Sequence, residues 1–278
     1  MILSCLNKTK LLIKFFFILS LFVSFSLYSN TCFEIFHAFF ACPVALSESK
    51  LPQISSTTIK KRKRLTKAEQ EAIKPSQEQI DILVGAFLGD AYSRKYAKSK
   101  NSHVRFDQST IHKEYLFYLF SLLKNLCGMA QPRETSRFNK STKTSHNSYY
   151  FVTYSLPCLN KFHDLFYVNG KKVVPKNIAD YLNPRALAIL LQDDSHWSKR
   201  EKTVIVSTNA FTLQDCNLLC AALLSKLNLI AKPNITHKLK DGSQAYVIRF
   251  SSKPENLQRL KQLVIPYFHT SMLYKLGL

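Results

Sequence analysis

Two acidic residues at matching positions of an internal repeat are the strongest candidates for chemistry. The stretch "GAFLGDAY" places Asp90 directly after an apolar run, and "LAILLQDDS" places Asp194 in the same position, 104 residues later. If the fold brings two such carboxylates together, their charges repel and one stays protonated unless a cation lies between them. Mg²⁺ suits such a site, because it is a hard ion bound through few carboxylates, water and substrate phosphate.

A repeated α/β unit is predicted to position these acids. Apolar residues at helical spacing over 77–89 and 185–194 predict the helix that precedes each acid. Further helices are expected at 113–128, 159–168, 212–227 and 255–268, and strands at 103–109, 148–155, 202–209 and 244–251. Since the same order of elements follows each acid, the body of the chain is predicted to be two copies of one unit.

The two acidic segments resemble the LAGLIDADG motifs of homing endonucleases, in which the acid at the eighth position is catalytic. The resemblance to the monomeric, two-motif branch of that family runs over residues 83–278. It is also carried by "KKVVPKNIADYLNPRALAILLQDD", "TNAFT" and "IPYFHTSMLYKL". One motif alone is a weak signal, whereas two motifs at this spacing with these flanking segments are specific.

The resemblance implies an α+β fold, a pseudo-two-fold tandem repeat of αββαββα-type units whose two antiparallel sheets form a DNA-binding saddle. The first half is expected over 76–183 and the second over 184–278. The family's motif helices pack against each other, which accounts for Gly85 and Gly89. Each glycine costs a helix interior roughly 1 kcal/mol but permits close approach of another backbone. In the second motif helix, Ile189 occupies the position that Gly85 has in the first. The packing of the two helices therefore cannot be symmetric.

The resemblance also implies a metal site. Asp90 and Asp194 are expected to be catalytic and to bind Mg²⁺, and the backbone carbonyls of Gly89 and Asp193 are expected to help hold the metal. A metal so placed polarises the scissile phosphodiester and activates water. The cysteines and histidines show no ligand spacing typical of zinc, and seven scattered cysteines do not indicate a disulfide framework.

Two lysines match the family's active-site lysines, one in each half. Lys172 follows Asp90 by 82 residues, and Lys275 follows Asp194 by 81 residues. A lysine near the scissile phosphate would stabilise developing charge or orient the attacking water. Lys171 is the competitor for the role given to Lys172.

The strands are expected to carry DNA recognition, because a β-ribbon fits the major groove and offers every second side chain to base edges. Any one cation among them could equally be a phosphate contact, which is the commoner role. The candidates are Tyr92, Arg94, Lys95, Arg105 and Gln108 in the first half, and Lys199, Arg200, Lys202, Asn209, Lys238, Lys240 and Arg249 in the second.

The charge of the chain points to a polyanionic partner. The 278 residues include 39 Lys and Arg against 18 Asp and Glu, giving a formal charge of +21. The basic residues are spread along the body, which favours nucleic acid over a basic tail. The alternative is a solvated cationic surface that reflects an AT-rich genome.

The first 75 residues differ from the body. Residues 1–50 are a hydrophobic leader whose apolar run resembles the core of a signal peptide. It could be a signal or anchor, a transit-like leader, or translated upstream sequence, and membrane association is not favoured. Residues 51–75 are expected to be a basic linker. Composition and resemblance suggest an organelle, either plastid (chloroplast) or mitochondrion.

The sequence predicts a site-specific, Mg²⁺-dependent endonuclease that cuts double-stranded DNA and promotes intron homing. It is expected to act as a monomer with no obligate protein partner. One alternative is an RNA maturase that assists the splicing of its host intron RNA. Another is a catalytically degenerate DNA-binding relic. Both acids and both lysines are present, which favours the nuclease.

Overall fold

The computed structural model describes residues 64–96, 99–139, 143–238 and 242–278. The expected leader, residues 51–63 of the expected linker and Lys240 lie outside the described residues. A short helix, α2 (Lys67–Ala72), is closed at its start by a capping box between Thr66 and Glu69. Within the described residues, no helix is long and apolar enough to cross a membrane.

The first half follows the order helix, two strands, helix, two strands, helix. Its elements are α3 (Gln77–Leu88), β1 (Tyr92–Lys95), β2 (Ser102–Ser109), α4 (Lys113–Leu122), β3 (Arg133–Asn139), β4 (Thr144–Val152) and α5 (Pro157–Phe166). Ser76 caps α3 by accepting a hydrogen bond from the backbone N–H of Gln79. A two-stranded ribbon of β5 (Tyr167–Val168) and β6 (Lys171–Lys172) follows.

The second half repeats that order. Its elements are α6 (Pro184–Asp194), β7 (Ser195–Ser198), β8 (Thr203–Ser207), α7 (Leu213–Leu227), β9 (Ala231–Lys238), β10 (Gln244–Phe250) and α8 (Pro254–Val264), with the short 3₁₀ turns η4 (Ile265–Tyr267) and η5 (Thr270–Leu276) at the end. Asn183 caps α6 and Pro184 occupies its first turn, while Thr212 caps α7 as the sequence predicts.

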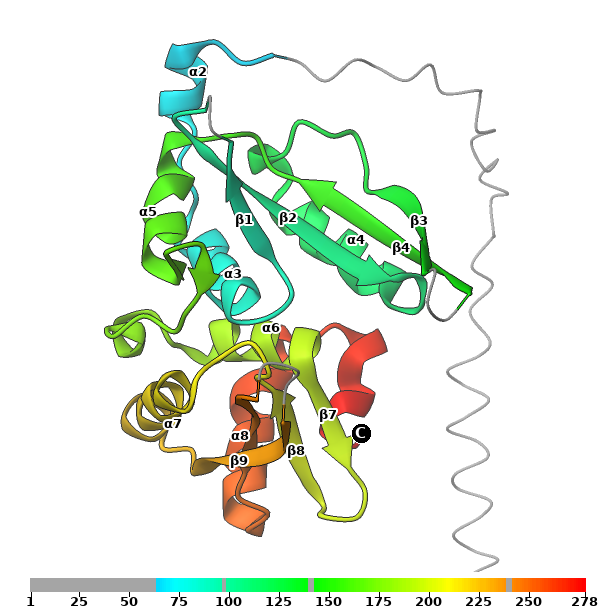
Figure 1. Cartoon of the computed structure of the whole chain (residues 1–278), viewed down its shortest axis with the longest axis vertical. Coiled ribbons are helices and arrows are strands. Elements are labelled where there is room, and N and C mark those ends of the chain that lie inside the picture. Colours follow the sequence, from blue (N-terminus) through cyan, green and yellow to red (C-terminus); the bar gives the residue numbers. More distant parts are fainter. Residues whose placement is uncertain (1–63, 97–98, 140–142, 239–241) are drawn as a thin grey trace, which may run out of the picture. The chain divides into compact units, whose positions relative to one another are not determined.

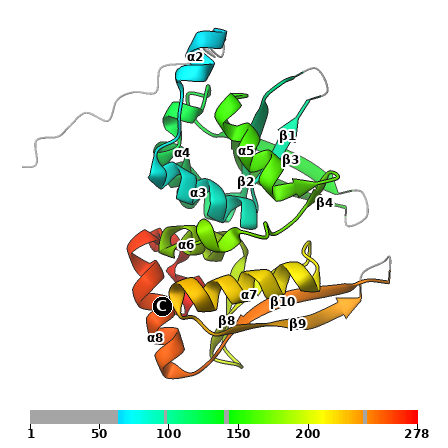
Figure 2. The same ribbon diagram turned by 90° about the vertical axis from the view of Figure 1, so that its left-hand side faces the viewer.

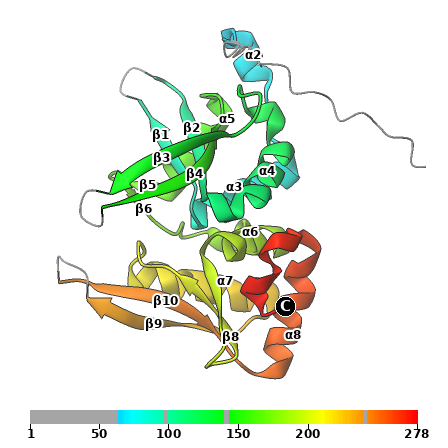
Figure 3. The same cartoon turned by 90° about the vertical axis from the view of Figure 1, so that its right-hand side faces the viewer.

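Two four-stranded antiparallel sheets have the same strand order. The first is β1-β2-β4-β3 and the second is β7-β8-β10-β9. Figure 2 shows α5 and α7 lying across one face of the first and second sheets, and Figure 3 shows the strands from the opposite side. The predicted α+β repeat of αββαββα-type units with two antiparallel sheets is confirmed.

The motif helices lie at the centre of the core. Figure 1 shows α3 and α6 side by side between the two halves. Their residues from Ile82 to Leu88 and from Ala186 to Leu191 are almost entirely buried. A helix that is apolar around its whole circumference is expected to be buried on all sides. The two acids therefore emerge at the ends of two deeply buried helices.

Two helices end four or more residues earlier than the apolar pattern predicts, and the helix expected over 159–168 ends at Phe166. The expected helix 113–128 stops at Leu122, because the backbone of Leu123 leaves the helical region at φ −104° and ψ 12°. A 3₁₀ turn, η2 (Lys124–Leu126), then buries Leu126 and redirects the chain toward β3. The expected helix 255–268 likewise stops at Val264 and continues as η4.

Candidate active site

The contact between α3 and α6 depends on glycine. A Cβ atom added at Gly85 would overlap the backbone carbonyl oxygen of Ala186 and would lie 2.7 Å from the Cβ of Ile189. At Gly89 an added Cβ would lie 2.7 Å from the Cβ of Asp193. The bulky Ile189 thus packs directly onto the bare backbone of Gly85. The expected close and asymmetric packing of the two helices is what the structure shows.

This contact brings the two motif acids together. Asp90 follows the cap of α3, and Asp194 is the last residue of α6. Burial, and then the charge of Asp90, raise the pKa of Asp194 to about 7. Removal from water also raises the pKa of Asp90, although a hydrogen bond from Gln108 and the charges of nearby lysines oppose the shift. Two neighbouring carboxylates with raised pKa values are stabilised in their charged form when a cation binds between them.

Asp193 contributes a third carboxylate that faces inward. Its Oδ1 accepts hydrogen bonds from the Tyr115 hydroxyl at 3.0 Å and from Gln108 Nε2 at 3.2 Å. Its Oδ2 lies 3.4 Å from the backbone nitrogen of Asp90. Burial and the charges of Asp90 and Asp194 raise the pKa of Asp193 well above its ordinary range. Asp193 therefore ties the second motif helix to the first half of the chain.

Each expected lysine binds the carboxyl end of the motif helix in its own half. Lys172 Nζ donates to the carbonyl oxygens of Gly89 at 2.5 Å and Ala91 at 2.9 Å. Lys275 Nζ donates to those of Gln192 at 2.5 Å and Asp193 at 2.8 Å. Helix ends leave such carbonyls without internal partners, and a cation satisfies them.

Burial lowers the pKa of both Lys172 and Lys275, while the surrounding carboxylates oppose that shift. Lys171, the competing candidate, is exposed on β6. The structure therefore places Lys172 at the site, beside the acids, and leaves Lys171 on the surface.

A hydrogen-bonded link crosses from the first half to the second on the Asp90 side. Gln108 Nε2 donates to Asp90 Oδ2 at 2.9 Å, and Gln108 Oε1 lies 3.3 Å from His112 Nδ1. His112 Nε2 lies 2.9 Å from the hydroxyl of Tyr274, the residue before Lys275. Burial, and then the charge of Lys275, lower the pKa of His112. The surroundings of Asp90 and Asp194 are therefore not equivalent.

The carboxylates of Asp90 and Asp194 are better suited to bind a hard divalent cation than the backbone carbonyls of Gly89 and Asp193, which were also expected to be ligands. Among the described residues, no group of three or more His, Cys, Asp or Glu side chains forms a ligand set. Mg²⁺ needs few protein ligands when substrate phosphate and water supply the rest, so Asp90 and Asp194 suffice. The carbonyls of Gly89 and Asp193 already accept hydrogen bonds from ammonium groups, which would repel a cation.

The first-half recognition candidates divide between the two faces of their sheet. Tyr92 pairs with Arg105 across β1 and β2, and both lie on the face opposite the buried Val104 and Phe106. Arg94 and Lys95 are exposed. Gln108 lies elsewhere, because it shares the inward face with Phe106, is only 7% exposed and binds the acids. Its place on a DNA-facing surface is not supported.

The second-half candidates gather mostly at turns and strand ends. Lys199, Arg200 and Lys202 are exposed in the turn between β7 and β8, and Asn209 and Lys238 are exposed beyond β8 and at the end of β9. Arg249 lies on β10, opposite Ile205 and Lys232. Lys240 lies outside the described residues, so its position is not described.

Three residues that sequence reasoning missed belong to this site: Tyr115, His112 and Tyr274. Tyr115 is fully buried. It belongs to the run "YLFYLF", whose apolar pattern predicts only a helix packed in the hydrophobic core. A buried tyrosine hydroxyl normally needs a hydrogen-bond partner, so this position carried a signal of a nearby polar group. His112 and Tyr274 are 162 residues apart, and no spacing pattern in the sequence predicts their contact.

Comparisons with known proteins identify relatives over most of the chain. A family model described as the LAGLIDADG DNA endonuclease family matches residues 80–257. A cytochrome b mRNA maturase bI2 of Debaryomyces hansenii is 33% identical over 203 residues, covering 72% of this chain and 74% of the relative. The DNA endonuclease I-ChuI of Chlamydomonas applanata is 26% identical over 212 residues, covering 73% of this chain and 95% of the relative.

Among solved structures, the homing endonuclease I-WcaI bound to its DNA recognition sequence has the same fold. The superposition has a TM-score of 0.67 at 22% sequence identity, and it covers 78% of this chain and 93% of that chain.

Proposed function

Because the chain belongs to the LAGLIDADG DNA endonuclease family, we propose that it is a site-specific, metal-dependent endonuclease that cuts double-stranded DNA and promotes intron homing. One observation carries the proposal: Asp90 and Asp194 emerge together at the ends of the packed helices α3 and α6. Each acid comes from one half, so a single chain supplies both. The protein therefore acts as a monomer and needs no obligate protein partner.

The residues of the site divide the work of phosphodiester hydrolysis. Asp90 and Asp194 would hold Mg²⁺, which when bound polarises the scissile phosphate and lowers the pKa of attacking water. Gln108 keeps the Asp90 carboxylate oriented through a 2.9 Å hydrogen bond. Lys172 and Lys275 hold positive charge next to the acids, where charge develops on the phosphate oxygens.

Double-stranded DNA is the proposed partner. I-WcaI, which shares the fold, is described as bound to its DNA recognition sequence, and I-ChuI is named a DNA endonuclease. Exposed cations on both sheets, such as Arg94 and Lys238, support the same partner. An organelle is the proposed location, since the maturase relative is named for the message of cytochrome b, a respiratory-chain protein.

The proposal is tested with the full chain, Mg²⁺ and a library of duplexes that carry intron-insertion sites. We expect double-strand breaks at one site, identified by sequencing the ends, and we expect Asp194→Asn to leave the duplexes intact. A wild-type protein that binds one site but leaves both strands intact would instead be a DNA-binding relic.

A maturase is the second candidate function. The observation that favours it is the 33% identity to a cytochrome b mRNA maturase over 74% of that relative. A maturase would bind its host intron RNA and would need neither acid for that binding. If the wild-type chain cuts no duplex but promotes splicing of its own intron, and Asp194→Asn splices equally well, the maturase function is the right one.

A further inference from the structure

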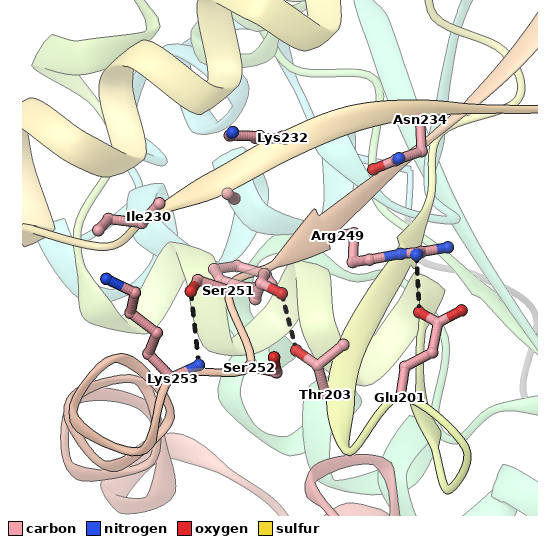
Figure 4. A pocket seen from close by; sticks show the side chains of 11 residues that line it. Glu201, Thr203, Ile230, Lys232, Asn234, Arg249, Ser251, Ser252 and Lys253 are labelled. Carbon is pink, nitrogen blue, oxygen red and sulfur yellow. Dashed lines mark hydrogen bonds and ion pairs between the residues drawn. The ribbon is translucent and has the colours of Figure 1, made fainter.

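Each half of the chain holds one arginine in place with an acid on the outer face of its sheet. Arg105 Nε and Nη2 donate to Asp107 Oδ2 at 3.0 and 2.7 Å, and its guanidinium lies 3.8 Å from the centre of the Tyr150 ring. In the second half, Arg249 Nη1 lies 2.9 Å from Glu201 Oε2, a contact drawn in Figure 4.

Each acid also contacts a second, outer arginine. Asp107 also contacts the exposed Arg137 at 3.5 Å, and Glu201 also contacts the exposed Arg200 at 3.3 Å. The side chains of these outer arginines are 67% and 90% exposed, against 20% for Arg105 and 39% for Arg249. Each acid thus lies nearer to one inner, less exposed arginine than to one outer arginine. Asp107 holds Arg105 with two hydrogen bonds, whereas Glu201 contacts Arg249 in a single ion pair at 2.9 Å.

An acid on a face that binds a polyanion is costly, since it repels phosphate. Stability is a weak reason for it, because the cost of removing two charges from water offsets much of their attraction in a partly buried ion pair. Orientation is a stronger reason. An arginine already fixed in one direction loses less side-chain freedom when it binds. In Arg105 the contacts to Asp107 use Nε and one side of Nη2, which leaves the other N–H groups free to donate.

We propose that Arg105 and Arg249 are base-reading residues that each recognise a guanine in the major groove. The inference rests on the proposed binding of double-stranded DNA. A fixed guanidinium fork matches the O6 and N7 acceptors of guanine, which is the commonest specific contact that arginine makes with a base. The outer residues Arg137 and Arg200 are long, exposed and loosely held, so they contact phosphates.

The strand register places the two arginines at non-equivalent positions. Tyr92 follows Asp90 by two residues and pairs with Arg105 on β2, the second strand of its sheet. His196 follows Asp194 by two residues and pairs with Ile205 on β8, and Arg249 lies one strand further on, on β10.

Adjacent strands are about 4.8 Å apart, which exceeds the rise of one base pair. We therefore expect the two guanines at positions that are not mirror-related. The residues equivalent to the two arginines in the opposite halves are Ile205 and Val152, which cannot make the same contact.

Selection from random-sequence duplexes by the full chain, without Mg²⁺ so that nothing is cut, tests this inference. We expect the selected site to contain one guanine that depends on each arginine. Arg105→Lys should lower the preference for the first guanine by roughly tenfold or more, and Arg249→Lys should do the same for the second. Lysine keeps the charge but loses the fork.

Arg137→Lys and Arg200→Lys are the matched controls, since each alters the other arginine on the same acid. They should leave base preferences unchanged. Asp107→Asn and Glu201→Gln should weaken the same preferences as the arginines they hold. These changes are near-isosteric, and equal thermal melting shows that the fold is kept.

Three results would overturn the proposal. The first is a selected site without guanine at positions that respond to Arg105 or Arg249, and the second is an equal loss of affinity for all duplexes in the lysine variants. The third is a pair of guanines at mirror-related positions, which contradicts the register argument. If the wild-type chain selects no duplex at all, the proposed DNA function fails, and the base-reading role fails with it.

Discussion

At the scale of single residues, the site holds three carboxylates in different surroundings. Asp90 accepts a hydrogen bond from Gln108, and Asp193 accepts hydrogen bonds from Tyr115 and Gln108. Asp194 lies near the charge of Asp90. Their different partners predict different effects of the same substitution.

Replacing Asp90 or Asp194 by Asn should abolish double-strand cleavage. Asn keeps the shape of the side chain and one acceptor oxygen but removes the charge that would hold Mg²⁺. Specific binding, measured by gel shift in Ca²⁺ or without metal, should survive. Cleavage by Asp194→Asn at the wild-type rate would rule out this assignment.

Asp193→Asn should retain substantial activity, because an amide oxygen can still accept from the Tyr115 hydroxyl and from Gln108. Asp193→Leu should instead leave the buried Tyr115 hydroxyl without a partner, at a cost of about 1–3 kcal/mol of folding free energy. Chemical denaturation of both variants measures the difference, and equal stabilities would contradict the role given to Asp193.

Lys172→Met or Lys275→Met should lower the cleavage rate by orders of magnitude. Loss of one pre-placed charge stabiliser typically costs about 3 kcal/mol in the transition state. Site affinity should change far less, since many other cations hold the duplex. Lys171→Met is the control and should cleave normally, because Lys171 is exposed. A defect in Lys171→Met alone would show that the wrong lysine was chosen.

The raised pKa of Asp194 predicts how the metal-free protein responds to pH. A carboxyl whose pKa moves from 3.8 to about 7 on folding binds its proton more tightly in the folded state. Folding stability is therefore lost as pH rises through that window. Asp194→Asn should remove this loss. In EDTA, the melting temperature of Asp194→Asn should exceed that of the wild type by more at pH 8 than at pH 5. An equal difference at both pH values would contradict the raised pKa of Asp194.

At the scale of elements, the site depends on the contact between α3 and α6. Helix ends position the acids only if the two backbones approach closely, and Gly85 permits that approach. The side chain of Ile189 on α6 packs directly against the backbone of Gly85 on α3.

Gly85→Ala should destabilise the protein by about 1–3 kcal/mol, because the new methyl group overlaps the backbone of Ala186. At an exposed helix position the same change would instead be stabilising by roughly 1 kcal/mol, so the sign of the effect is the test. Lys226→Ala on the exposed side of α7 is the control and should change the melting temperature little. A more stable Gly85→Ala variant would disprove the close contact.

At the scale of the whole molecule, the charge of +21 predicts strongly salt-dependent DNA binding. Each phosphate that a Lys or Arg neutralises releases counterions, so the logarithm of the affinity should fall steeply with the logarithm of salt concentration. Titrations of a duplex between low and physiological salt measure the slope. A slope near zero would contradict binding through the basic sheets.

The sequence by itself determined the repeat, the two motif helices and the positions of Asp90 and Asp194. The helices and the acids are local features, since helical periodicity and the residue after a helix end can be recognised within about a dozen residues. The repeat follows from comparing two such local patterns. The spacing of Lys172 and Lys275 also came from the repeat, because equivalent residues in two copies of one unit keep similar separations.

Only the tertiary structure decided which residues surround the acids. Gln108 lies three residues after Arg105, and alternation along β2 places the two on opposite faces. Packing then directs Gln108 to Asp90 and Asp193, directs Tyr115 to Asp193, and joins His112 to Tyr274. Such contacts connect residues far apart in sequence, and they form only when α3 and α6 fix the two halves against each other, so no local pattern encodes them.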